Sequence, residues 1–494
     1  MRQVARSLLL VTVDCLRADH VGFLGDPRPT TPFLDSLAQQ SIVFRNAIAS
    51  GIPTYYSLPA LLASRYPLAL GRDVIGIAPG EATLATELQT CGYNTAAFVA
   101  ANPYVSAAYG YGHGFDVFDD FLHFADGETQ PETPNDERPA LREANLLLAR
   151  ACHRLPALGT AYDELYFRYC QKVSRSEKDS FDHLRKFPAA DAVVEKAICW
   201  LRENSGAPFF LWLHFMDPHA PYYPKEQALR ELGNDINAAE AKYLNSYWGR
   251  SDLHANQLTK KRSAILGLYD AGIRWVDNQL RVLSDTLREL KLWESCAIAV
   301  TADHGEEFLE HGARFHAPAK LTEELIRVPL LLHVPHFPAS TVDEPLGLID
   351  LAPTLLDLLD IPAVAAFRGR SCWRQLTTNQ TWARPVITEC AYGCSNPVQS
   401  EQRMAPRLLA VRKSSHKLVV DFGSRTADLF DLRSDPNELR PLPLDTAEDI
   451  RKELLQVAGK HIAQSSRSRD YDLRFTAQMR EFRQQYELAA SRPN

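Results

Sequence analysis

Short apolar runs that alternate with helical patterns are the feature of this sequence that most restricts its fold. Residues 8–13 form the first run, which contains β-branched side chains and lacks the polar alternation of a half-exposed strand. Such a run is typical of a strand buried on both faces of a parallel sheet. Comparable runs follow at residues 96–99, 209–214, 297–301 and 328–334.

Helical patterns fill the segments between these runs, at residues 31–40, 81–89, 192–203 and 264–290. Strands that alternate with helices indicate an α/β fold, because right-handed crossovers place the helices on the faces of a mostly parallel sheet. We therefore predict one large α/β domain over residues 1–380, interrupted by a helical insertion at about 120–190. Residues 381–494 predict a smaller α+β subdomain with terminal helices.

The composition argues against several classes of protein. The chain has 54 basic and 61 acidic residues and a net charge of −7, which argues against a nucleic-acid-binding protein. No apolar run approaches the roughly 20 residues that span a bilayer, so we expect no transmembrane anchor. The nine cysteines are odd in number and scattered, which predicts a reducing, cytoplasmic environment rather than a disulfide framework. The sequence does not indicate an oligomeric state.

Polar side chains stand where several of the predicted strands end. Because ligands of open α/β sheets bind at the carboxyl ends of strands, these side chains are candidates for one site. Carboxylates and imidazoles together suit zinc or manganese, while calcium and magnesium remain open. The candidates are Asp14 and Arg17 after the first run, His214, Asp217 and His219 at the third, and Asp303, His304 and His316 at the fourth.

A nucleophile is expected in the segment of residues 51–67. Residues 58–63 have a helical composition, with Ser57 as an N-cap and Pro59 in the first turn. Thr54 would then precede a helix N-terminus, where free amides and the helix dipole favour an anion. A metal-coordinated hydroxyl at that point can attack phosphorus or sulfur. The alternative is that Thr54 and Ser57 only cap the helix.

The sequence resembles the sulfatase branch of the alkaline-phosphatase superfamily from about residue 7 to residue 440. The resemblance is carried in order by LLLVTVDCLRADHVGFLG, FFLWLHFMDPHAPYYP, TADHGEEFLEHG, IRVPLLLHVP and LIDLAPTLLDLLDI, and then by the segment RKSSHKLVVDFGSRTADLFDLRSDPNEL. It implies a hydrolase or transferase with a large, mostly parallel sheet flanked by helices, a small C-terminal α+β subdomain, and a small anionic ester as substrate.

The chain departs from the usual sulfatase pattern at the nucleophile. Aligning ALLASRYP with the family places Thr54 where sulfatases carry a cysteine or serine that becomes formylglycine. No cysteine lies between Cys15 and Cys91, and Asp14 is followed by Cys15 instead of a second acid. TYYSLPALLAS is similar instead to the Thr-x-x-Ser-x-Pro stretch of phosphoethanolamine transferases and lipoteichoic-acid-synthase relatives, which use an unmodified threonine.

This second resemblance implies roles for the site residues. Asp14, Thr54, Asp303 and His304 would hold one metal ion, and Thr54 would form a covalent phosphothreonine intermediate with a soluble phosphoester, phosphodiester or phosphonate. His219 and His316 would bind oxygens of the transferred group or a second metal. Further candidates for substrate binding are His214, Asp217 and Arg17, although Arg17 serves equally well as a structural ion-pair partner.

Two other functions remain open from the sequence. Ser57 begins a Ser-x-Pro stretch similar to the serine-type sulfatase signature, so the chain can also be a sulfuric-ester hydrolase that uses Ser57 or an atypical nucleophile. The third possibility is a non-catalytic relative that binds an anion. Retention of every metal-type ligand argues against that third possibility.

Overall fold

The computed structural model describes residues 5–122, 148, 152, 158, 162, 164–169 and 180–464. Its larger part contains a nine-stranded sheet in the order β10-β2-β9-β6-β1-β5-β3-β4, with β11 paired to β2. The strands are β1 (Ser7–Val13), β2 (Ile42–Ile48), β3 (Asn94–Val99), β4 (Val117–Asp119), β5 (Phe209–Phe215), β6 (Cys296–Ala302), β9 (Arg327–His333), β10 (Ser340–Val342) and β11 (Leu346–Gly347).

The first strand lies in the middle of this sheet. β1 pairs in parallel with β5 on one side and with β6 on the other. All seven of its residues are buried, as its apolar sequence predicts. Only β9 runs antiparallel, to β2 and to β6, among the pairings of this sheet in the described residues. The structure therefore confirms the predicted α/β class with a mostly parallel sheet.

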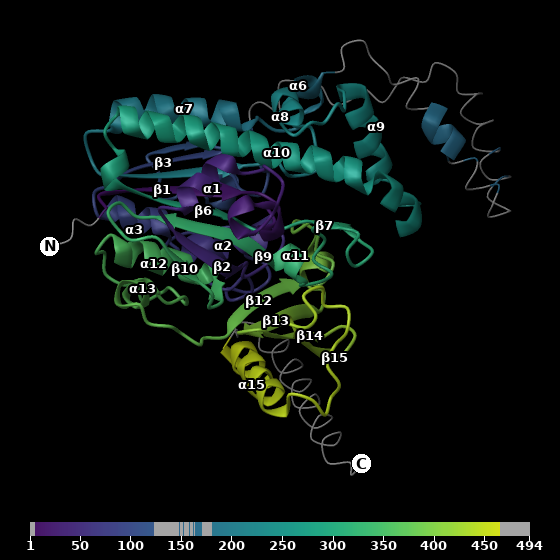
Figure 1. The fold of residues 1–494 in the computed structure, drawn as a ribbon. Helices are drawn as coiled ribbons and strands as arrows, with labels where there is room; N and C mark the ends of the chain where they lie inside the picture. Colours follow the sequence, from purple (N-terminus) through teal and green to yellow (C-terminus); the bar gives the residue numbers. More distant parts are fainter. Residues whose placement is uncertain are drawn as a thin grey trace.

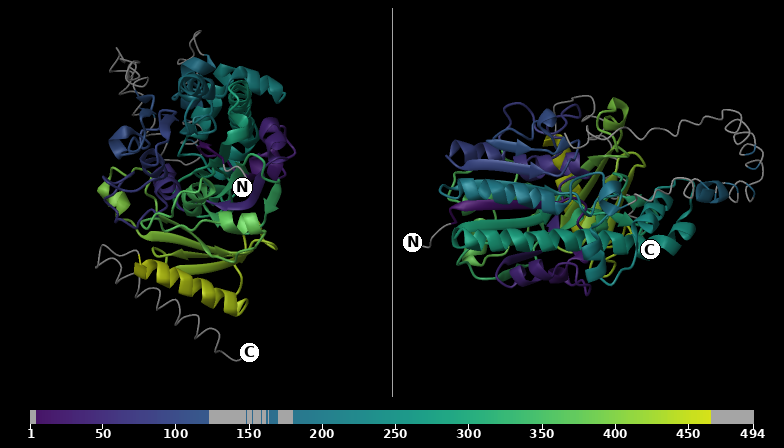
Figure 2. Two further views of the ribbon diagram at one scale, coloured as in Figure 1. Left: turned by 90° about the vertical axis from the view of Figure 1, so that its left-hand side faces the viewer. Right: turned by 90° about the horizontal axis from the view of Figure 1, so that it is seen from above.

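Helices cover both faces of the sheet. α1, α7 and α10 lie on one face, and α2, α3 and α12 lie on the other (Figures 1 and 2). The long helix α10 lies beside α7 (Figure 1). The bounds are α1 (Pro32–Ala38), α2 (Thr54–Ala63), α3 (Leu84–Thr90), α7 (Ala190–Asn204), α10 (Ala255–Glu289) and α12 (Leu351–Leu358).

A second, antiparallel sheet forms the C-terminal subdomain below the first sheet in Figure 1. Its strands are β12 (Val386–Ala391), β13 (Arg407–Lys413), β14 (His416–Asp421) and β15 (Thr426–Asp431), and α15 (Glu448–Gln464) packs against it. The predicted boundary near residue 380 remains our proposal. Most of the predicted insertion at 120–190 lies outside the described residues. None of the described helices has the length and apolarity needed to cross a membrane.

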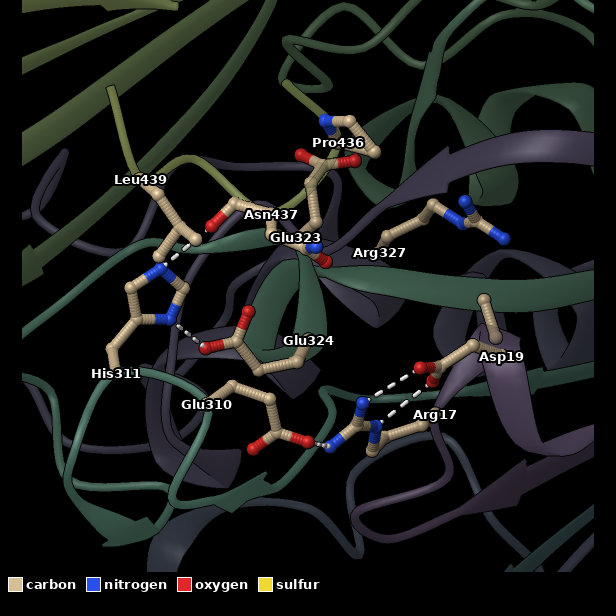
Figure 3. Close-up of a pocket in the computed structure, with 11 residues that line it drawn as sticks. Arg17, Asp19, Glu310, His311, Glu323, Glu324, Arg327, Pro436, Asn437 and Leu439 are labelled. Carbon is tan, nitrogen blue, oxygen red and sulfur yellow. Dashed lines mark hydrogen bonds and ion pairs between the residues drawn. The ribbon is translucent and has the colours of Figure 1, made fainter. Parts of the chain in front are cut away.

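The two parts of the chain meet around His311, beside a cavity of about 420 Å³ (Figure 3). His311 Nδ1 lies 2.7 Å from Glu324 Oε1, and its Nε2 lies 2.9 Å from the main-chain oxygen of Asn437 in the C-terminal part. Both partners are acceptors, so the ring must carry two protons to donate both hydrogen bonds. The hydrogen bond to Glu324 accordingly raises the pKa of His311.

This arrangement predicts a pH-dependent contribution to stability. Because the folded-state pKa of His311 is raised, its contribution is complete below the unfolded value of about 6.5 and is lost as the pH rises through the folded value. We expect His311→Gln to lower the free energy of unfolding by about 1 kcal/mol at pH 6 and by less at pH 9. Urea unfolding at both pH values measures this. His336→Gln, at an exposed histidine, is the control, and an equal loss at both pH values would contradict the prediction.

Candidate active site

The carboxyl ends of the two central strands bring three of the predicted metal ligands together. Asp14 follows β1, and Asp303 and His304 follow β6. Since β1 and β6 are parallel neighbours, these ends meet at one edge of the sheet. All three side chains are fully buried.

Thr54 enters the same cluster from the N-terminus of α2. Its Oγ1 lies 3.2 Å from Asp14 Oδ2 and 3.1 Å from His304 Nε2. A hydroxyl at this distance from a carboxylate and an imidazole is placed as a nucleophile or as a metal ligand. The structure therefore brings the four residues predicted for the first metal site within contact of one another.

The predicted start of this helix was wrong. α2 begins at Thr54 with Pro53 as N-cap, so Thr54 belongs to the first turn and Ser57 is not a cap. Ser57 Oγ instead donates to the main-chain oxygen of Asp303 at 2.5 Å. Pro59 consequently lies inside the helix and not in its first turn, where its missing N–H leaves the Tyr55 carbonyl without the usual helical donor.

The donors of this cluster fit a divalent cation. Asp14, Asp303 and His304 each offer one ligand atom, and these atoms lie within 4.8 Å of one another. Asp303 Oδ2 is buried without a hydrogen-bond partner among the described residues. Two buried carboxylates side by side are costly unless a positive charge compensates them. Burial and the Asp14 charge raise the pKa of Asp303, so this pair needs such a charge.

Neighbouring histidines stabilise the ionised form of Asp14. Burial alone would raise the pKa of Asp14, but His219, His214 and His304 outweigh it and hold the pKa well below its usual range. His214 Nε2 lies 3.5 Å from Asp14 Oδ2, while its Nδ1 is 2.8 Å from Thr12 Oγ1. The structure thus places the predicted residue His214 against the cluster of candidate metal ligands.

His219 and His316 lie side by side next to the cluster. Their ring centroids are 5.0 Å apart, and the His316 ring is 4.7 Å from that of His304. Burial lowers the pKa of His316, but the buried carboxylate of Glu306, 3.5 Å from Nδ1, outweighs burial and raises it to about 9. Glu306 therefore favours positive charge on His316, whereas burial lowers the pKa of His219.

Two of the predicted substrate-binding residues contact other partners. The Arg17 guanidinium, which lines the cavity of Figure 3, pairs with Asp19 and with Glu310 at 2.6 Å each. Asp217 Oδ1 lies 3.3 Å from Arg185 Nη1 and accepts from the backbone N–H of Ala190. The structure does not bring these two side chains into the metal cluster. It supports the ion-pair interpretation of Arg17.

Three further residues contact the site residues that the sequence predicts. Asn102 donates from Nδ2 to Asp14 Oδ2 at 3.1 Å. Cys15 Sγ lies 3.1 Å from Asp14 Oδ1, and Glu306 lies behind His316. Asn102 follows β3 as Asp14 follows β1, so the rule of polar residues at strand ends could have found it.

The contact between Asn102 and Asp14 predicts a positioning role. Asn102→Ala leaves one carboxylate oxygen of Asp14 without its donor. Loss of a hydrogen bond that orients a metal ligand typically costs about 10–100-fold in metal affinity or activity. We expect a loss in that range with an unchanged melting transition. Measuring kcat, metal content and thermal unfolding in parallel tests this. Activity equal to wild type would contradict the positioning role.

Comparison with known proteins gives the family. Residues 6–361 match the sulfatase family, and residues 310–464 match the C-terminal domain of N-sulphoglucosamine sulphohydrolase. An arylsulfatase of Clostridium perfringens is 25% identical over 480 residues, which cover 88% of this chain and 90% of the relative. The multifunctional alkaline phosphatase superfamily protein PehA of Trinickia caryophylli is 24% identical over 504 residues, which cover 90% and 92%.

Solved structures show the same fold. The phosphonate monoester hydrolase of Agrobacterium radiobacter superposes with a TM-score of 0.62 at 18% identity, covering 93% of this chain and 95% of that one. This likeness shows that the two chains share a fold, with a large, mostly parallel sheet and a C-terminal antiparallel sheet. The sulfatase match spans well over half of the chain and includes Asp14, Thr54, Asp303 and His304. The chain is therefore a member of the sulfatase family of hydrolases, within the alkaline-phosphatase superfamily.

Proposed function

We propose that the protein is a metal-dependent hydrolase or transferase of a small phosphoester, phosphodiester or phosphonate, with Thr54 as nucleophile. One observation carries the proposal. The Thr54 hydroxyl contacts Asp14 and His304, whereas the Ser57 hydroxyl is occupied by the main-chain oxygen of Asp303. Of the two predicted nucleophiles, Thr54 is thus the one that shares the ligand cluster. The resemblance of TYYSLPALLAS to the threonine-nucleophile transferases supports the same assignment.

The proposed reaction is a double displacement. A divalent cation, with zinc or manganese preferred, held by Asp14, Thr54, Asp303 and His304 would lower the pKa of the Thr54 hydroxyl and polarise the ester. Thr54 Oγ1 loses its proton and attacks phosphorus, and the bond from phosphorus to the oxygen of the leaving group breaks. The leaving alkoxide takes up a proton, and a phosphothreonine (or, from a phosphonate, a phosphonylated threonine) forms.

The second step returns the enzyme to its starting state. Water or an acceptor alcohol attacks the phosphothreonine, and the bond from phosphorus to Thr54 Oγ1 breaks. His219 and His316 stabilise the charge that develops on the non-bridging oxygens in both steps. Asn102 holds Asp14 in place during the cycle through its hydrogen bond.

The cytoplasmic location predicted from the scattered cysteines stays a prediction.

Hydrolysis of sulfuric esters is the second candidate, because arylsulfatases are among the relatives. In that case Ser57 or an atypical residue would serve as nucleophile. The two candidates predict different products from substrates that share one leaving group.

Turnover of matched substrates tests the proposal. The wild type and Ser57→Ala are compared on three substrates with the same phenol leaving group. These are an aryl phosphodiester, an aryl phosphonate ester and an aryl sulfate. We expect the wild type to turn over at least one of the phosphorus esters, and Ser57→Ala to retain that activity. Release of sulfate without turnover of any phosphorus ester, and its loss in Ser57→Ala, would overturn the proposal in favour of the second candidate.

A further inference from the structure

The cavity of about 420 Å³ beside His311 is separate from the cluster around Thr54 (Figure 3). None of its described lining residues belongs to the candidate metal ligands. Its walls come from both parts of the chain: η1 (Ala18–His20), α11 (Glu323–Ile326) and the start of β9 on one side, and the loop of residues 436–439 on the other. Pockets of about 300–1,000 Å³ are typical of sites for small organic ligands.

Arg327 is the cation of this cavity that lacks a partner within the described part of the chain. It is the first residue of β9 and is half-buried. Its guanidinium makes no hydrogen bond or ion pair with any described residue, and Figure 3 shows no dashed line on it. Arginine presents five N–H donors in a planar fork that fits a carboxylate or a phosphate. An anion is therefore the ligand that this side chain can take.

The acidic side chains near η1 are already paired with cations. Asp19 accepts hydrogen bonds from Arg17 on both carboxylate oxygens, at 2.8 and 2.6 Å. Glu310 pairs with Arg17 at 2.6 Å and with Arg262 at 2.9 Å. The charges of these two carboxylates are therefore compensated without Arg327.

The two acidic side chains of α11 are paired as well. Glu323 contacts Arg412 with one carboxylate oxygen and lies 3.1 Å from Lys417 with the other. Glu324 lies 2.7 Å from the ring of His311, which donates from both nitrogens and is therefore positively charged. All four carboxylates that line the cavity thus have a cationic partner.

The cavity consequently keeps one uncompensated positive charge. Burial would raise the pKa values of Asp19 and Glu323, but the cations in contact with them lower both values, and Arg327 adds a smaller effect without contacting either. A ligand with a single negative charge completes the balance. A phosphate dianion would bring a second negative charge next to four carboxylates, and an ammonium ion would compete with cations that are already paired.

The C-terminal loop supplies an amide and an apolar wall. The main-chain oxygen of Asn437 lies 2.9 Å from His311 Nε2, whereas its side-chain amide makes no hydrogen bond with a described residue. Pro436 and Leu439 line the same cavity, and Leu439 is 62% exposed. Apolar walls with a few polar groups that fix the orientation are typical of sites for small organic molecules. These residues favour a carboxylate that carries an apolar group.

We propose that Arg327 binds the carboxylate of a small monocarboxylic acid in this cavity. The Asn437 amide is the second donor, and the apolar part of the acid packs against Leu439. A ligand in this position contacts both parts of the chain and stabilises their junction. Its binding does not rest on the proposed function, because the site shares no described residue with the Thr54 cluster.

Calorimetric titration of the metal-loaded full chain with benzoate tests this site. Benzoate combines one carboxylate with a compact apolar ring, while benzylamine reverses the charge and inorganic phosphate raises it. We expect benzoate to bind, and Arg327→Gln to weaken its binding by about tenfold or more, because the charged donors to the carboxylate are lost. The same variant should leave the affinities for phosphate and benzylamine unchanged.

Matched variants connect the binding to the cavity. Leu439→Glu alters an exposed residue and places a negative charge beside the ligand, so benzoate binding should again weaken by about tenfold or more. This variant covers the case in which Arg327→Gln fails to fold. Arg45→Gln is the control, because Arg45 is an exposed arginine on the neighbouring strand β2 and pairs with Asp343. It should bind benzoate as the wild type does.

Three outcomes would overturn the proposal. The first is that benzoate does not bind the wild type, and the second is an equal benzoate affinity in wild type, Arg327→Gln and Leu439→Glu. The third is an equal loss of phosphate and benzoate binding in Arg327→Gln, which would contradict the monocarboxylate class. Labelling of Thr54 by a phosphorus ester is measured independently, so failure of either proposal leaves the other standing.

Discussion

Replacing Thr54 with alanine is expected to lower kcat by about 10⁴-fold or more, because the covalent step loses its nucleophile. Asp14, Asp303 and His304 remain in place in this variant, so metal binding should weaken far less than turnover. Steady-state rates on a phosphorus ester and metal content per chain are the two measurements. Turnover within about tenfold of wild type would show that another group attacks the substrate.

Ser57→Ala is the matched control for this experiment. Both hydroxyls are buried in α2, and they lie three residues apart in the sequence. Ser57→Ala removes only the hydrogen bond to Asp303, whose loss costs about 1 kcal/mol and therefore a modest change in rate. A larger loss of activity in Ser57→Ala than in Thr54→Ala would reverse the assignment of the nucleophile.

Removal of the metal is expected to abolish turnover and to destabilise the fold. Without a cation the buried carboxylates of Asp14 and Asp303 repel each other across the end of the central strands. A metal present at about 1,000 times its Kd stabilises the native state by about 4 kcal/mol, so the apoprotein should unfold at a clearly lower temperature. Thermal unfolding and turnover before and after chelation measure both effects, and zinc or manganese should restore both.

Variants connect this effect to the cluster. Asp303→Ala should lack turnover and bound metal even in excess metal, as the chelated protein does. Glu310→Gln is the control, because Glu310 pairs with Arg17 and Arg262 outside the cluster and should leave metal content unchanged. Chelation without any change in turnover or in melting temperature would contradict a metal at these residues.

The strand ends of this protein could be read from the sequence because their geometry is general. An uninterrupted apolar run such as that of β1 fixes a buried parallel strand, and parallel strands end at a common edge. That rule was enough to predict that Asp14, Asp303 and His304 lie close together. The same rule, applied to β3, would have added Asn102.

Other features depend on contacts that no local pattern records. Cys15 has a left-handed φ of +62° and a thiol 3.3 Å from His316 Nδ1, and the sequence carries no signal for either feature. Arg17 pairs with Glu310, which is almost 300 residues away along the chain, so its direction could not be derived from its neighbours. The start of α2 was placed too late because Pro59 suggested a first turn, whereas the helix begins at Thr54 and includes the proline.

The most direct test of the account is the mass of the tryptic peptide of residues 46–65 after the protein is mixed with a phosphorus ester and quenched in acid. This peptide contains both Thr54 and Ser57. We predict that it gains the mass of the transferred phosphorus group, including any substituent that stays on phosphorus. Fragmentation should place this group on Thr54 and find Ser57 unmodified. Loss of two hydrogens at Ser57 would mean a formylglycine, and would contradict the threonine mechanism.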